Sequence, residues 1–78
     1  MIYGTTLLET DSELFAAALT QTSVYIWSLD HQGVYYQVGT GIIVKYTPEQ
    51  VQIKSDYEES SYSTKWYSRD TNEFSIRS

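Results

Sequence analysis

The fold is decided by residues 24–46, which read VYIWSLDHQGVYYQVGTGIIVKY. This stretch holds more than half of the chain's valine and isoleucine residues and several of its aromatic ones, a composition that favours β-strands. Residues 30–33 suit a type I turn that ends in a left-handed glycine, and residues 39–41 permit a second tight reversal. We therefore predict three antiparallel strands, at residues 24–29, 34–39 and 42–46.

The predicted strands are apolar on both faces. Alternation of side chains gives an aliphatic face of Val24, Ile26, Val34, Val38, Ile42 and Val44, and an aromatic face of Tyr25, Trp27 and Tyr35. A sheet that is apolar on both sides needs a cover on both, and we expect a helix to cover the aliphatic face. The aromatic face is the candidate partner-binding surface, because Tyr and Trp are enriched at interface hot spots. The alternative is that curling of the sheet, the N-terminal residues and a loop at 55–61 cover this face within the monomer.

The segment before these strands predicts a short amphipathic helix at residues 11–20. Thr10 and Glu13 have the spacing of a capping box, in which each side chain satisfies a backbone N–H of the first turn. Leu14, Phe15, Ala18 and Leu19 recur at helical spacing and should form the face that packs on the sheet.

The segment after residue 46 predicts further strands at residues 51–54, 62–68 and 74–77, separated by polar turns. The expected fold is α+β, with one N-terminal amphipathic helix followed by an antiparallel meander of about five or six strands. Sheets of this kind must protect their edges, so we expect the meander to be strongly curled or to form a small half-open barrel. The alternative is an open sheet with the helix across one face.

The composition describes a single small acidic domain spanning residues 1–78, with a formal net charge of -5. The chain contains no cysteine, which removes disulfides and zinc-thiolate sites, and it contains one histidine. We therefore expect no cofactor and no structural metal. Because so short a chain buries a small core, self-association is the expected aid to stability.

An acidic loop follows the fourth predicted strand and carries Asp56, Glu58 and Glu59. It lacks the regular acid spacing and the turn glycine of a calcium-binding EF-hand loop. A solvated loop is the simplest interpretation. We also include these three acids in the candidate partner-binding surface, because a cluster of negative charge favours a partner with a basic surface.

Catalytic residues are scarce, so we do not expect an enzyme. His31 is the one histidine, and it lies in a predicted exposed turn beside residues too near in sequence to form a triad with it. A small ribonuclease is the one enzyme class that the residue types admit. Residues 39–41 lack the lysine and the following helix of a phosphate-binding loop.

The N-terminal residues have neither the basic nor the apolar region of a signal peptide, and no apolar run is long enough to span a bilayer. We therefore expect a cytoplasmic protein without a membrane partner. The predicted function is a small protein-binding module of the inhibitor, immunity or adaptor type. A self-associating structural or accessory subunit is the first alternative. A small barrel that binds single-stranded nucleic acid is the second, and the scarcity of Lys and Arg disfavours it.

Overall fold

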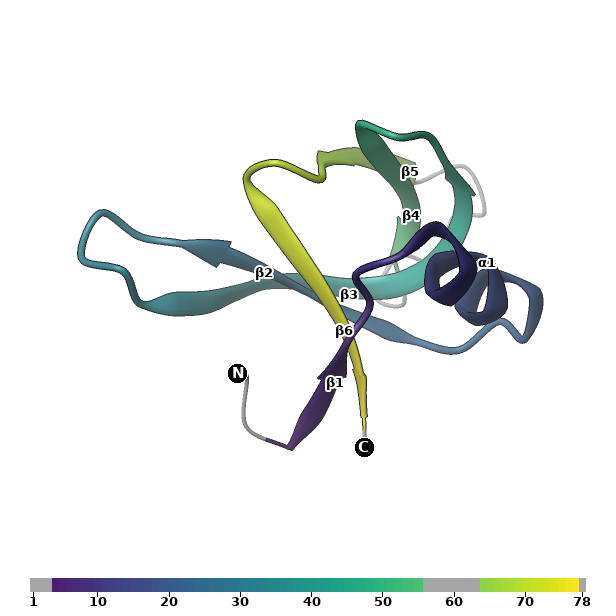
Figure 1. The fold of residues 1–78 in the computed structure, drawn as a ribbon, viewed down its shortest axis with the longest axis horizontal. Helices are drawn as coiled ribbons and strands as arrows, with labels where there is room; N and C mark the ends of the chain where they lie inside the picture. The colour runs from purple at the N-terminus through teal and green to yellow at the C-terminus, as the bar shows by residue number, and fades with distance from the viewer. Residues whose placement is uncertain (1–3, 56–63, 78) are drawn as a thin grey trace.

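The computed structural model describes residues 4–55 and 64–77, which form one helix and six antiparallel strands in an open sheet (Figure 1). The protein is therefore α+β, and mostly β. The elements in chain order are β1 (Thr5–Leu7), α1 (Asp11–Leu19), β2 (Val24–Leu29), β3 (Tyr35–Tyr46), β4 (Gln50–Ser55), β5 (Thr64–Ser68) and β6 (Asn72–Arg77).

The sheet has the strand order β1-β6-β2-β3-β4-β5. Strands β2 to β5 form the predicted meander, and β6 then returns to pair with β2 on one side and β1 on the other. The expected strongly curled sheet or half-open barrel is not confirmed. Closure would require the end strands β1 and β5 to hydrogen-bond to each other, and no ladder joins them among the described residues. The open sheet with the helix across one face is the architecture that forms.

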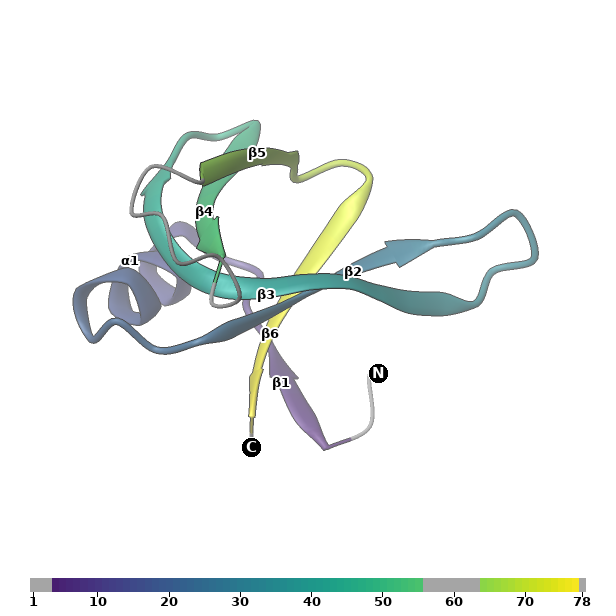
Figure 2. The same ribbon diagram turned by 180° about the vertical axis from the view of Figure 1, so that it is seen from behind.

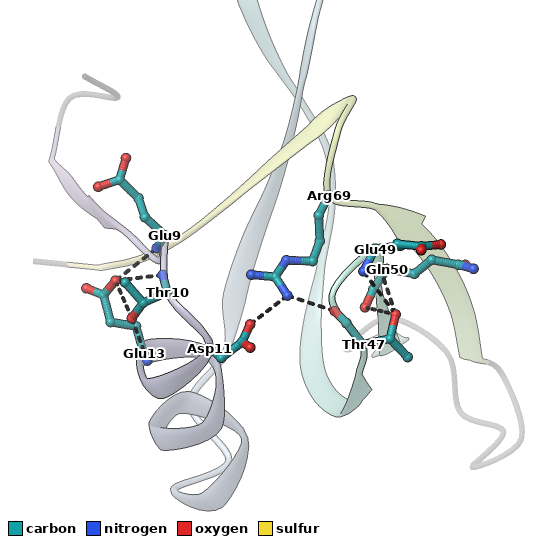
Figure 3. Close-up of polar contacts among 8 residues, drawn as sticks. All are labelled: Glu9, Thr10, Asp11, Glu13, Thr47, Glu49, Gln50 and Arg69. Atoms are coloured by element: carbon teal, nitrogen blue, oxygen red, sulfur yellow. Dashed lines mark hydrogen bonds and ion pairs between the residues drawn. The ribbon is translucent and has the colours of Figure 1, made fainter.

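The start of α1 is the predicted capping box (Figure 3). The Glu13 carboxylate accepts hydrogen bonds of 3.0 Å from the backbone N–H groups of Glu9 and Thr10, and the Glu13 N–H donates to the Thr10 hydroxyl at 3.2 Å. The backbone N–H of Glu9, then the N–H and hydroxyl of Thr10, lower the pKa of the Glu13 carboxyl below its ordinary value of 4.5.

The predicted apolar face of the helix is partly wrong. Leu14 and Ala17 are the residues that α1 buries, whereas Phe15 and Leu19 are exposed. Leu14 and Ala17 lie three residues apart and therefore share one face of the helix. That face joins a core whose buried apolar members are Leu8, Leu14, Ala17, Val24, Ile26, Ile43, Val51, Ile53 and Phe74.

Residues 30–33 form the predicted turn between β2 and β3. The Asp30 carboxylate accepts hydrogen bonds from the backbone N–H groups of Gln32 at 2.8 Å and Val34 at 2.9 Å. Gly33 has a φ of 81°, the left-handed conformation that glycine adopts without a steric penalty.

The predicted reversal at residues 39–41 is wrong, because β3 is one continuous strand of 12 residues. Its two glycines serve close packing. A Cβ atom on Gly41 would lie 2.5 Å from Cγ2 of Ile53 and would overlap the Lys54 carbonyl, and one on Gly39 would lie 3.4 Å from the Tyr67 hydroxyl. Glycine at these two positions lets β4 and the side chain of Tyr67 approach β3.

Two β-bulges in β3 overturn part of the predicted aliphatic face. The register moves from Ile26–Gly39 to Trp27–Gln37, which leaves Val38 without a partner, and a second shift leaves Val44 without one. A bulge changes which side chains face the core beyond it. Val24 and Ile26 are buried as expected and Ile42 is half-buried, but the bulge residues Val38 and Val44 are exposed, and Ile43 takes the core position. Val34 is also exposed, because it lies at the end of the hairpin, beyond the part of β2 that pairs with β6.

Arg69 connects three segments that lie far apart in the sequence (Figure 3). Its Nη1 donates hydrogen bonds of 2.7 Å to the Asp11 carboxylate and to the Thr47 carbonyl, and its backbone N–H donates to the Glu49 carbonyl at 2.8 Å. The start of α1, the β3–β4 turn and the β5–β6 turn are thereby held together.

Candidate interaction surface

The β2–β3 hairpin extends beyond the rest of the sheet, and residues 29–39 of this hairpin are here named the arm. Strand β6 accompanies β2 only as far as Ser28, and β4 accompanies β3 only from Gly41 onward. Among residues 4–55 and 64–77, the arm is therefore a two-stranded ribbon. Figures 1 and 2 show it projecting at one end of the long axis of the molecule, with α1 toward the other end.

Exposed apolar side chains are concentrated on the arm. Its five large apolar residues are each about half exposed: Leu29 by 50%, Val34 by 56%, Tyr35 by 41%, Tyr36 by 49% and Val38 by 41%. If each presents roughly half of about 150–200 Å², the arm offers about 400 Å² of side-chain surface. Patches of that size on small proteins are often functional.

The three predicted aromatic residues lie along one face of the hairpin. Tyr25 and Trp27 are both half-buried, with ring centroids 6.3 Å apart and ring planes inclined by 50°. Tyr35 pairs with Leu29 farther out, and the pairing register places Leu29 and Tyr35 on the same face as Trp27. Tyr25 and Trp27 are thus brought together, and Tyr35 extends this aromatic face onto the arm.

Trp27 is partly committed to the fold. Its indole N–H donates a hydrogen bond of 2.8 Å to the hydroxyl of Ser75, which lies on β6 and is fully buried. Sequence reasoning did not find Ser75 or its role. In the sequence, Ser75 lies between two apolar residues of the last strand, so alternation predicts that its side chain lies on the opposite face of the sheet from theirs. Its contact with Trp27 could not be predicted in this way, because it depends on the pairing of β6 with β2.

Sequence reasoning also missed the exposure of Val34 and Val38, which it assigned to a covered strand face, and the exposure of Tyr36. They are exposed because the part of β3 in the arm has neither α1 nor β4 beside it. The acidic residues proposed as part of the same surface, Asp56, Glu58 and Glu59, lie outside the described residues.

The arm carries little charge. Residues 32–40 contain no charged side chain, and Asp30 uses its carboxylate within the turn. His31 is exposed at the tip of the same turn. The surface is therefore suited to apolar contact and to hydrogen bonding by the backbone rather than to ion pairing.

The described part of the chain also has hollows away from the arm. An apolar groove of about 470 Å³ lies between α1 and β3, lined by residues that include Phe15, Leu19 and Val44. A more polar hollow of about 270 Å³ lies beside Arg69 and Glu73. Within residues 4–55 and 64–77, no three His, Cys, Asp or Glu side chains are placed to hold a metal ion.

No family model, curated protein or solved structure matches this chain. The candidate function therefore depends on the geometry of the chain itself. Of the helices in the described segments, none combines the length and apolar character needed to cross a membrane.

Proposed function

We propose that the protein is a small protein-binding module that acts by occupying a partner surface, with the arm and the adjoining aromatic face as its contact. The observation that supports this proposal is the concentration of half-exposed Leu, Val and Tyr side chains on a projecting ribbon. Exposed apolar side chains are unfavourable in water, and a cluster of them gains most when a partner covers it.

The chemistry of the arm fits recognition of a protein. Tyrosine combines a large apolar ring with a hydroxyl group and loses little conformational freedom when it is buried, which makes it common at the centre of interfaces. Tyr35 lies on one face of the arm and Tyr36 on the other, so a partner that surrounds the ribbon gains from both. Single-stranded nucleic acid has weaker support, since residues 32–40 include no Lys or Arg to contact phosphate.

We further propose that the acidic segment with Asp56, Glu58 and Glu59 is a second contact, directed at a basic region of the partner. We also propose that the protein acts in the cytoplasm. Inhibitors, immunity proteins and adaptors all act by occupying a surface of another protein. The identity of that protein would show to which of these three types this chain belongs.

Affinity capture with matched variants tests the proposal. The arm variant combines Leu29→Ser and Tyr35→Ser, and the control variant combines Phe15→Ser and Leu19→Ser on the exposed side of α1. We expect wild type and the control to retain the same protein from a native lysate, and the arm variant to lose it. The retained protein is then purified and its binding measured directly. Equal retention by all three baits would refute the role of the arm.

A further inference from the structure

The apolar groove between α1 and β3 is a feature that the proposed contact of the arm does not use. Its volume is about 470 Å³, and pockets for small molecules have volumes of roughly 300–1,000 Å³. Its lining reaches the core, because it includes the buried Ile43 and the partly buried Ala18 and Tyr46. Phe15 and Leu19 line it from α1 and are 53% and 72% exposed. An apolar molecule in the groove would remove these two side chains from water, which favours binding.

The second β-bulge of β3 gives this groove a basic side chain. Four consecutive residues of the strand line the groove, namely Ile43, Val44, Lys45 and Tyr46. In a regular strand, successive side chains point to opposite faces of the sheet, so two of the four would point away. A bulge interrupts this alternation, and the register shift lies between Ile43 and Lys45. Lys45 is thereby added to a lining that otherwise consists of apolar and aromatic residues.

The two ends of the groove differ in character. Nη1 of Arg69 donates to both the Asp11 carboxylate and the Thr47 carbonyl, so the start of α1 lies beside the residue that follows β3 (Figure 3). Lys45 is two residues before Thr47 and therefore lies toward the start of α1. Leu19 is the last residue of the helix and lies toward its other end. The groove thus runs from a cationic end at Lys45 to an apolar end at Leu19.

The local charge favours an anionic group at Lys45, although the whole chain is acidic. The described residues that line the groove include no acid, and within residues 4–55 and 64–77 the exposed Lys45 makes no ion pair. The two acids of α1 are engaged elsewhere. Asp11 pairs with Arg69, while Glu13 accepts the N–H groups of the helix cap and lines the hollow on the other side of the helix, toward β1 and β6. The ammonium group of Lys45 is therefore available to a ligand.

We propose that the groove binds a fatty acid, with its carboxylate at Lys45 and its alkyl chain beside Phe15 and Leu19. This site is separate from the arm and goes beyond the proposed function. The carboxylate complements the ammonium group, and the methylene groups cover the exposed apolar side chains. Two turns of a partner helix, about 10–12 Å across, would occupy about 1,000 Å³, roughly twice the volume of the groove, whereas a single alkyl chain is narrow.

Titration of the isotope-labelled full chain with decanoate, followed by NMR, tests the proposal. We expect a dissociation constant on the order of 0.1–1 mM, as for a small ligand in an open groove. The backbone amide signals of Ala18 and Ile43 should shift, and that of Tyr36 on the arm should not. Each buried methylene group favours binding by about fourfold, so octanoate should bind at least about fivefold more weakly. Decanoate that leaves the groove signals unmoved at about 5 mM would overturn the proposal.

Paired charge-reversal variants separate the role of Lys45 from that of the net charge. Lys45→Glu and Arg77→Glu change the net charge equally, and Arg77 is exposed at the end of β6, away from the groove. Lys45→Glu should weaken decanoate binding at least about threefold, because it replaces the attraction of an exposed ion pair by repulsion, and Arg77→Glu should weaken it by less than about twofold. Equal weakening by the two variants would overturn the placement of the carboxylate.

A matched pair of apolar variants separates the groove from the arm. Phe15→Ser with Leu19→Ser should weaken decanoate binding at least about tenfold, and Leu29→Ser with Tyr35→Ser should leave it unchanged. All four side chains are exposed, so both variants are expected to fold. The opposite order of effects would overturn the site. Co-sedimentation of the protein with phosphatidylglycerol vesicles, without any binding of free decanoate, would also overturn it, because a membrane surface would then be the occupant.

Discussion

Replacing Trp27 with Phe should destabilise the protein mainly through Ser75. The indole N–H of Trp27 donates to the Ser75 hydroxyl at 2.8 Å, and Ser75 has no exposed surface. When the indole is removed, this hydroxyl loses a donor at a site that water does not reach. Leaving a buried polar group without its partner costs about 1–3 kcal/mol, to which the loss of indole packing adds.

Removing the other partner of this hydrogen bond should lower the free energy of unfolding by less. Ser75→Ala removes the buried hydroxyl and leaves the indole N–H of Trp27, which is half-buried and closer to solvent. We expect a loss of about 1 kcal/mol or less from this variant. In the Ser75→Ala background, Trp27→Phe removes only packing, so its cost should fall by about 1–2 kcal/mol relative to its cost in the wild type.

Urea unfolding of the four proteins of this double-mutant cycle measures these differences. We expect the four proteins to share one slope of unfolding free energy against urea concentration, so that their urea midpoints report stability. In a thermal melt of a domain of this size, each 1 kcal/mol should move the midpoint temperature by about 4–8 °C. Additive effects of the two substitutions, or a larger loss from Ser75→Ala than from Trp27→Phe, would refute the role assigned to the hydrogen bond.

Three further predictions concern the fold. Gly41→Ala should lower the free energy of unfolding by more than about 3 kcal/mol, measured by urea, because its Cβ would overlap backbone of β4. Arg69→Met should lower the free energy of unfolding by about 1–2 kcal/mol, because it also removes the hydrogen bond to the Thr47 carbonyl. Asp11→Asn should lower it by about 0.5 kcal/mol, since Asp11 is exposed and its ion pair is screened by solvent. A larger loss from Asp11→Asn than from Arg69→Met would contradict this reasoning. The lowered pKa of Glu13 gives stability that is complete above pH 4.5 and is lost as the pH falls through that lowered pKa. Between about pH 5 and 3, Glu13→Gln should therefore lose less stability than wild type, and identical pH profiles would exclude this contribution.

The features that the sequence predicted correctly are those that depend on neighbouring residues. The capping box of Thr10 and Glu13, the turn that ends at Gly33 and the bounds of the strand at 24–29 all formed as expected. Each depends on side chains within a few positions of the backbone that they stabilise. The polar turn after β3 is also local, since the Thr47 hydroxyl accepts a hydrogen bond of 3.0 Å from the backbone N–H of Gln50, three residues away.

The predictions that failed concern contacts between residues far apart in sequence. Gly39 and Gly41 looked like a turn because glycine favours turns, but their packing neighbours Tyr67 and Ile53 lie on other strands. The position of β6 between β1 and β2 also follows from tertiary pairing rather than from local pattern, and it leaves the sheet open.

The candidate site was predictable to a similar extent. Alternation alone places Tyr25 beside Trp27, and the structure gives their rings a direct contact. The half-burial of Trp27 against Ser75 and the exposure of Tyr36 depend on where β6 begins, at Asn72, and where β4 ends, at Ser55. These limits decide which part of the hairpin is an isolated ribbon, and periodicity in the sequence does not encode them.

The bulge at Val38 links the fold to the proposed binding. A shift of one residue in a strand register reverses the face of every side chain beyond it, so this bulge places Tyr35 with Leu29 and Trp27 while Gly39 stays opposite Ile26 in the core. One irregularity thus keeps the body of the sheet packed and gives the arm a defined aromatic face. For this reason a regular hairpin of the same composition would not present the same surface, and the bulge is expected to be as important to binding as the exposed tyrosines themselves.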